Sequence, residues 1–193
     1  MTIHTIGDSH AHFGWSGVCC HWLGPMLCFS FGTKKGLCDI KKYNITNKDT
    51  VIFCFGEIDC RCHIYKHVTK TLSYKDIINE IVEKYFCAIV EIMNNSKAQI
   101  FIYNVVPPVE KCNTIQNPKY PYLGTDEERK KYVLYFNEQL KKKCLDYKYG
   151  FFNIYDKYTD EYGFLNKKLS DGNVHIKNGT FITEFIQNNI EQK

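Results

Sequence analysis

Five short and largely apolar runs constrain the fold of this chain more than any other feature of its sequence. They cover residues 2–8, Val18 to Leu23, Thr50 to Phe55, Ala98 to Val106 and Phe151 to Tyr155. Runs that are apolar throughout, rather than alternating, are typical of parallel strands buried on both faces. We therefore expect a parallel sheet that is covered by helices on both sides.

Helical patterns lie between these runs. Ser73 is a plausible N-cap for a first long helix, and Thr125 to Glu128 has the form of a capping box for a second. The apolar faces of these two helices are Ile78, Ile81, Val82, Tyr85, Ile89 and Ile92, and Val133, Phe136, Leu140 and Cys144; Phe181, Ile182, Phe185, Ile186 and Ile190 mark a closing helix. This alternation predicts a doubly wound, three-layer α/β domain over residues 1–193, either alone or as one domain of a longer protein.

The composition narrows the classes of partner. Hydrophobic residues make up 44% of the 193 positions and the formal net charge is +4, which is too mild to indicate a nucleic-acid-binding face. The N-terminus lacks the pattern of a signal peptide, and no stretch approaches the ~20 apolar residues of a membrane span. We therefore expect a cytoplasmic protein whose ten cysteines are reduced, with Cys54, Cys87 and Cys144 in the core.

Four segments with chemically useful side chains follow strands or precede the last helix. They are Gly7-Asp8-Ser9-His10, Leu23-Gly24-Pro25, Gly56 to Arg61 and Asp171 to His175. Ligands of doubly wound sheets bind beyond the carboxyl ends of the strands, where these segments should meet. A serine becomes a nucleophile when a histidine takes its proton, and a carboxylate orients that histidine. Glycines such as Gly24 and Gly56 allow the backbone to approach a reacting carbonyl.

The first and last of these segments resemble the SGNH/GDSL hydrolases. Ile6-Gly7-Asp8-Ser9 is similar to the first sequence block of that family, and Asp171 to His175 is similar to its last. The resemblance implies a flavodoxin-like fold with a five-stranded parallel sheet. It also implies Ser9 as nucleophile, His175 as base, Asp171 as the partner of His175, and oxyanion donors from the backbones of Ser9 and Gly24.

Two positions depart from the family pattern. The third block usually reads Gly-x-Asn-Asp, where the asparagine donates to the oxyanion, but this chain has Ile58 at that position. Losing one such donor costs about 100- to 1,000-fold in rate, so we expect compensation from Arg61 or the region of Cys60. In the last block, one residue more than usual separates Asp171 from His175.

The remaining polar residues have two interpretations each. Glu57, Asp59 and Arg61 form either an ion-pair cluster beneath the site or direct substrate contacts. His10 is expected on the substrate side or in packing. Cys60-Arg61-Cys62-His63 and Cys19-Cys20-His21 do not match the cysteine spacing of structural zinc sites, so we expect no metal and no bound cofactor.

These features together predict acyl transfer through an acyl-Ser9 intermediate. The string from Gly56 to Arg61, with His21 to Pro25, resembles a branch of SGNH-like proteins among polysaccharide and glycosylation enzymes, which implies a small-molecule or glycan substrate. We expect an acetyltransferase that moves acetyl from acetyl-CoA to a sugar or nucleotide sugar. The alternatives are a carbohydrate O-acetylesterase and a non-catalytic carbohydrate-binding relative.

Overall fold

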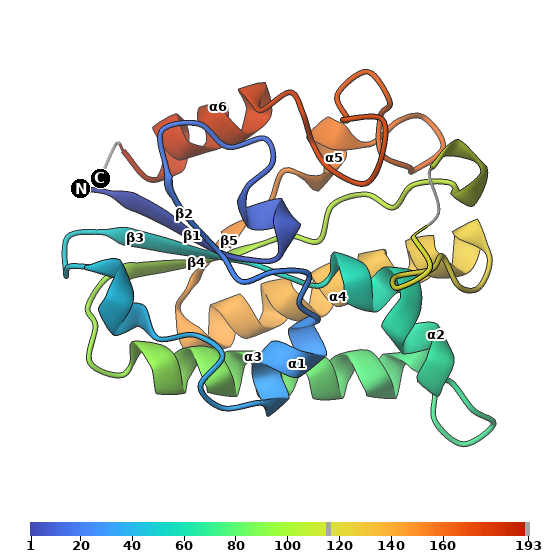
Figure 1. Cartoon of the computed structure of the whole chain (residues 1–193), viewed down its shortest axis with the longest axis horizontal. Coiled ribbons are helices and arrows are strands. Elements are labelled where there is room, and N and C mark those ends of the chain that lie inside the picture. The colour runs from blue at the N-terminus through green and yellow to red at the C-terminus, as the bar shows by residue number, and fades with distance from the viewer. Residues whose placement is uncertain (115–116, 192–193) are drawn as a thin grey trace.

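The computed structural model describes residues 1–114 and 117–191, which form a three-layer α/β arrangement around one parallel sheet (Figure 1). The strands are β1 (Ile3–Gly7), β2 (Cys19–Trp22), β3 (Thr50–Cys54), β4 (Gln99–Tyr103) and β5 (Gly150–Phe152). They lie in the order β2-β1-β3-β4-β5, and every neighbouring pair is parallel. The predicted five-stranded parallel α/β fold is confirmed.

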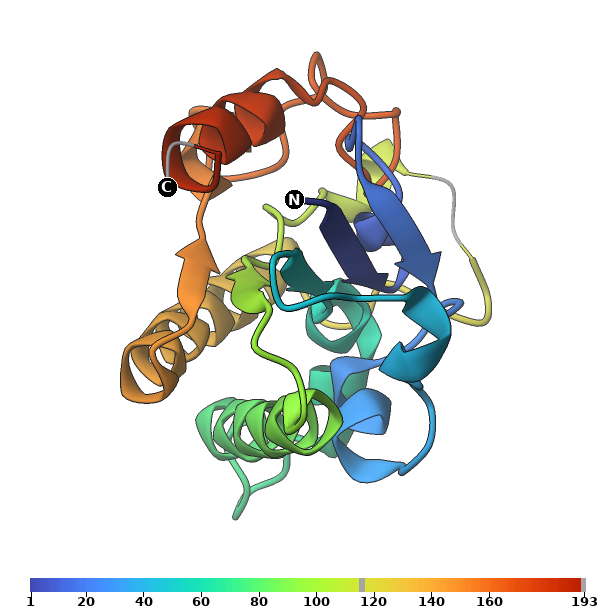
Figure 2. The same ribbon diagram turned by 90° about the vertical axis from the view of Figure 1, so that its left-hand side faces the viewer.

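Helices cover both faces of this sheet. The helices are α1 (Cys28–Thr33), α2 (Ile64–His67), α3 (Tyr74–Met93), α4 (Asp126–Tyr147), α5 (Tyr155–Tyr158) and α6 (Thr180–Asn189). Figure 2 shows α6 on one side of the sheet and α3 on the other. The predicted capping box is present, since Thr125 pairs with Glu128 at the start of α4. The predicted N-cap Ser73 also forms a capping box, with Asp76 at the start of α3.

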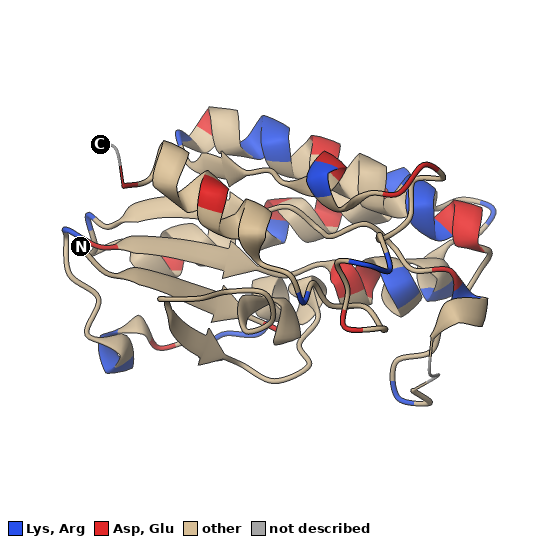
Figure 3. Cartoon of the chain, turned by 90° about the horizontal axis from the view of Figure 1, so that it is seen from above, with Lys and Arg blue, Asp and Glu red and all other residues tan. Residues whose placement is uncertain are grey.

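The continuously apolar strands are explained by two separate cores. Successive residues of a strand point to opposite faces, and in β3 the side chains of Val51 and Phe53 enter the core beneath α3 and α4. Ile52 and Cys54 enter the other core, beneath α6. A strand that serves two cores has no polar face. Charged side chains are instead intermixed on the helices and loops (Figure 3).

The edge strand β2 differs from the prediction of a strand buried on both faces. Cys19 and Trp22 are exposed, and Cys20 and His21 are half-buried, because β2 pairs only with β1. Its register places Trp22 beside Gly7, so both strands end at the same level. Gly7 itself has no room for a side chain, because a Cβ there would lie 2.0 Å from the carbonyl oxygen of Cys54.

The cysteines are free thiols, and their burial corrects one prediction. Cys54 and Cys144 are buried as expected, but Cys87 is exposed on α3. Burial raises the pKa of the Cys60 and Cys62 thiols, which disfavours their reactive thiolate form. Among the described residues, no helix is both long and apolar enough to cross a membrane.

Candidate active site

The turn after β1 presents Ser9 at the carboxyl edge of the sheet. Asp8 accepts the backbone N–H of His10 and so caps the 3₁₀ turn Ser9–Ala11, which begins at the serine. Asp8 is fully buried whereas Ser9 is half-buried. The Ser9 carbonyl accepts the N–H groups of His12 and Phe13. The turn therefore fixes the Ser9 backbone and leaves its hydroxyl at the rim.

A second loop brings His175 to that hydroxyl. The Nε2 atom of His175 lies 2.9 Å from Ser9 Oγ, and its Nδ1 atom lies 2.7 Å from Asp171 Oδ2. With the proton on Nδ1 donated to Asp171, Nε2 is free to accept the Ser9 proton. The structure thus joins the three residues in the serine–histidine–carboxylate order.

The extra residue between Asp171 and His175 is accommodated by a tight turn. The Asp171 N–H donates to the His175 carbonyl at 3.0 Å. Asp171 Oδ1 accepts the N–H groups of Asn173 and His175, at 2.8 and 3.2 Å, and Gly172 takes a φ of 85° that favours glycine. The longer spacing therefore keeps Asp171 against His175.

The environment of His175 favours the neutral imidazole. Burial lowers the pKa of His175, nearby His10 lowers it further, and Asp171 opposes both effects without cancelling them. Partial burial on its own would raise the pKa of Asp171, but its hydrogen bonds from His175 and from the Asn173 N–H lower it overall. A carboxylate beside a neutral histidine is the state that a general base requires.

Phe13 was not anticipated from the sequence as part of this site. Its ring stacks on His175 with centroids 4.1 Å apart and planes at 16°. This contact covers one face of the base and restricts rotation of its ring. No local pattern marks it, because the two residues are far apart in the chain.

The two glycines proposed for the site have different surroundings. Gly24 follows β2 with a φ of 83°, and a Cβ there would meet nothing within 4 Å, so its backbone borders open space. At Gly56, a Cβ would lie 2.7 Å from a methyl group of Val105. Gly56 is buried, and its lack of a side chain permits packing rather than access for a substrate, which corrects the binding role expected for it.

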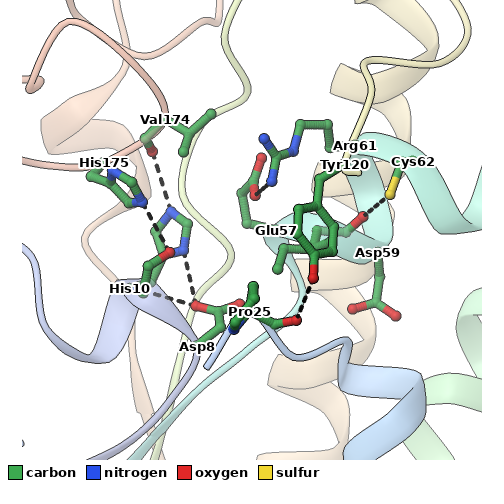
Figure 4. A network of polar contacts seen from close by, with 12 residues as sticks. Asp8, His10, Pro25, Glu57, Asp59, Arg61, Cys62, Tyr120, Val174 and His175 are labelled. Atoms are coloured by element: carbon green, nitrogen blue, oxygen red, sulfur yellow. Dashed lines mark hydrogen bonds and ion pairs between the residues drawn. The ribbon is translucent and has the colours of Figure 1, made fainter. Parts of the chain in front are cut away.

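Arg61 does not take the compensating role that was expected from the loss of asparagine at Ile58. Its guanidinium forms an ion pair with Glu57 at 3.1 Å (Figure 4). The guanidinium also lies over the ring of Tyr122, 5.3 Å from the centroid. Ile58 is buried and carries no donor. The structure favours the bracing role for the Glu57–Arg61 pair.

Asp59 and His10 are also structural rather than substrate-facing. Asp59 is fully buried and accepts the backbone N–H groups of Cys28 and Phe29, at 2.6 and 3.1 Å, which open α1. His10 is 5% exposed, and both of its ring nitrogens contact buried acceptors. The substrate-binding interpretation of these two side chains was therefore wrong.

Metal ligation finds no geometric support in the described part of the chain. Within residues 1–114 and 117–191, no three His, Cys, Asp or Glu side chains converge as a metal site would require. The residues that the structure brings together at the carboxyl edge of the sheet, namely Ser9, His175 and Asp171, are suited to proton transfer.

No protein-family model matches the sequence, and no curated protein matches it significantly. Solved structures do match it. One is a GDSL-like lipase from Bacteroides thetaiotaomicron, with a TM-score of 0.62 and 14% identity over 99% of this chain and 88% of that chain.

Two esterase structures match over a similar extent. An acetyl xylan esterase has a TM-score of 0.62 and 11% identity, over 98% of this chain and 100% of that one. The aryl esterase of M. smegmatis has a TM-score of 0.57 and 11% identity, over 97% and 98%. At these identities the similarity concerns the fold alone, and the chain has the fold of the SGNH/GDSL hydrolases over nearly its whole length.

Proposed function

We propose that this protein is a serine esterase that removes an acyl group from an O-acylated carbohydrate through an acyl-Ser9 intermediate. The observation that carries the proposal is the hydrogen-bonded chain from Ser9 through His175 to Asp171, with contacts of 2.9 and 2.7 Å. Packing alone does not require these three side chains to be hydrogen-bonded in series, since Ser9 and His175 are only half-buried.

The reaction follows from the direction of these contacts. His175 Nε2 takes the Ser9 proton as Oγ attacks the ester carbonyl, and Asp171 stabilises the imidazolium that forms. His175 then returns the proton to the departing sugar oxygen. Water, activated by the same nitrogen, attacks the acyl-serine and regenerates Ser9.

The oxyanion requires backbone donors, because Ile58 supplies none. The N–H groups of His10, Ala11, His12 and Phe13 are engaged within the turn, by Asp8 or by the Ser9 carbonyl. Ser9 is the first residue of this turn, so the turn itself provides no partner for its N–H. We assign the oxyanion to the N–H groups of Ser9 and of Gly24, whose backbone borders open space.

Access to water favours hydrolysis over transfer. The His175 and Asp171 side chains are 16% and 23% exposed, so the base lies within reach of solvent water. Esterases are also among the solved structures that share the fold. Acetyl transfer from acetyl-CoA to a sugar would use the same intermediate with a different acceptor, and the assay below includes it.

The carbohydrate part of the proposal is supported by an exposed aromatic residue at the end of β2, the strand next to β1. Trp22 is 61% exposed and pairs in register with Gly7, two residues before Ser9. A flat apolar ring at this level suits the apolar face of a sugar. An acetyl xylan esterase shares the fold.

The proposal is tested by three assays on the wild type and on Ser9→Ala. p-Nitrophenyl acetate measures esterase activity, acetylated xylan and sugar acetates measure carbohydrate specificity, and acetyl-CoA with free sugars measures transfer by mass spectrometry. A fluorophosphonate should label the wild type and not the variant. Absence of both labelling and acetate release would contradict an acyl-serine enzyme, whereas acetylated sugar from acetyl-CoA would reassign it as a transferase.

A further inference from the structure

A buried histidine connects the nucleophile turn to the loop that carries the base. His10 Nδ1 lies 3.0 Å from Asp8 Oδ1, and its Nε2 lies 3.2 Å from the carbonyl oxygen of Val174, the residue before His175 (Figure 4). Asp8 is fully buried and His10 nearly so. The His10 carbonyl is itself held by the indole N–H of Trp15 at 2.7 Å.

The partners of His10 determine how many protons its ring carries. A backbone carbonyl only accepts hydrogen bonds, so Nε2 must carry a proton. Asp8 Oδ1 already accepts the backbone N–H of His10 at 2.8 Å, and a carboxylate is far less basic than an imidazole. The proton between Asp8 and Nδ1 therefore resides on the ring. Both nitrogens donate, and His10 is an imidazolium.

We propose that His10 is a positioning residue, an imidazolium at neutral pH that ties the Ser9 turn to the His175 loop and so sets the Ser9–His175 contact. This inference rests on the proposed function, because the contact that it sets is the proton-transfer step. Neutral His10 would direct a lone pair at either Asp8 or the Val174 carbonyl, and one of the two connections would be lost.

The charges around His10 are consistent with this state. The groups that face it are Asp8 on its own turn, Glu57 after β3 and His175 on the opposite loop, where the two imidazole centroids are 5.1 Å apart. Burial alone would lower the pKa of His10, but Asp8, its hydrogen bond and Glu57 raise it. The same positive charge lowers the pKa of His175 and keeps that base neutral.

A spectroscopic experiment tests the protonation state without any substrate. In 15N-histidine-labelled wild-type protein at pH 8, the ring of His10 should show two N–H groups. The signals are assigned by their loss in His10→Gln and their retention in His12→Gln, which removes an exposed imidazole from the same turn. If His10→Gln does not fold, Asp8→Asn provides the assignment, because it perturbs the ring directly. A single ring N–H on His10 would overturn the proposal.

A pH profile tests the positioning role. Wild-type kcat/KM for p-nitrophenyl acetate should fall at alkaline pH, when His10 loses its second proton. Asp8→Asn removes the partner charge and should move that fall to lower pH by about 1–3 pH units, with little change in KM. His12→Gln should keep the wild-type profile. A uniform loss of kcat at every pH in Asp8→Asn would indicate a purely structural contact and refute the inference.

The two proposals fail in distinguishable ways. A protein with no ester hydrolysis and no fluorophosphonate labelling of Ser9 contradicts the proposed function, whatever the His10 spectrum shows. An active, labelled enzyme with singly protonated His10, or with an unshifted alkaline limb in Asp8→Asn, contradicts the inference alone.

Discussion

Replacing Asp171 by asparagine should inactivate the enzyme through the tautomer of His175. The two carboxylate oxygens have separate tasks, since Oδ1 accepts the N–H groups of Asn173 and His175 while Oδ2 accepts from the His175 ring. An amide has one oxygen. If the amide oxygen stays with the two backbone donors, the amide nitrogen faces His175 Nδ1 and donates a hydrogen bond to that atom.

The size of the expected loss in kcat follows from the contacts of Asp171. A donor opposite Nδ1 moves the histidine proton to Nε2, where it points at Ser9 Oγ and blocks proton acceptance. Reversing the amide would restore the tautomer but would leave two partly exposed N–H groups unpaired, at about 1 kcal/mol each. A cost of about 2 kcal/mol for the reversed amide means that roughly one enzyme molecule in 30 has the productive His175 tautomer. Loss of the charge that stabilises the imidazolium adds to this, for a total of roughly 10³–10⁴ in kcat.

Alanine at the same position provides the matched control. Asp171→Ala leaves Nδ1 open to water, because the His175 side chain is 16% exposed, and neither tautomer is imposed. It should therefore retain about 10-fold more activity than Asp171→Asn, on the argument from the tautomer alone. The assay is kcat/KM for p-nitrophenyl acetate at the pH plateau, with thermal denaturation as a folding control and 15N spectra to identify the protonated nitrogen. Asp171→Asn with activity equal to or above that of Asp171→Ala would refute the reasoning.

Four further outcomes are expected. Ser9→Ala and His175→Ala should each remove most activity and the double variant should be little worse, because the two act as one unit; additive losses in kcat would contradict this. The lowered pKa of His175 places the midpoint of the acid limb of kcat/KM below pH 6.5, because the base works only when neutral. A profile of kcat/KM from pH 4 to 8 with a midpoint above that value would contradict this prediction. Arg61→Ala should lower the free energy of unfolding in urea by about 3–5 kcal/mol, since it leaves buried Glu57 unpaired, with kcat within a few-fold; the reverse pattern would return Arg61 to the oxyanion. Thiol titration without reductant should count all ten groups after denaturation, and in the native protein only the exposed ones should react rapidly, namely Cys19, Cys87 and Cys112.

The strands and helices that are marked by neighbouring residues in the chain were predictable from the sequence. The apolar runs predicted all five strands, because a parallel strand between two cores, such as β3, needs no polar face. The partial exposure of the edge strand β2 was not predicted. Ser73 and Thr125 marked helix starts, because a capping box is closed within four residues. The short helices α1, α2 and α5 were missed, since none of them is long enough to show a periodicity.

The roles of buried polar residues were not predictable, because their partners are distant in the chain. Asp59 contacts the start of α1, 31 residues away from Cys28. His10 contacts Val174, 164 residues away. A position next to the nucleophile suggested a substrate contact for His10, and only the fold shows that its ring points inward. The roles of Ser9 and His175 were implied by the resemblance of their segments to the SGNH/GDSL blocks, whose order and neighbouring strand or helix agreed with it.

The buried polar residues explain how the site can function with Ile58 in place of a side-chain donor. Asp59 holds the N–H groups of Cys28 and Phe29, and α1 begins at Cys28, four residues after Gly24. The segment that carries the Gly24 N–H is therefore anchored at both ends, by the pairing of β2 with β1 and by Asp59. Backbone donors are effective in an oxyanion site when they are fixed in advance. We therefore propose that in this chain the third block contributes by fixing the neighbouring backbone, while the first two blocks supply the oxyanion donors.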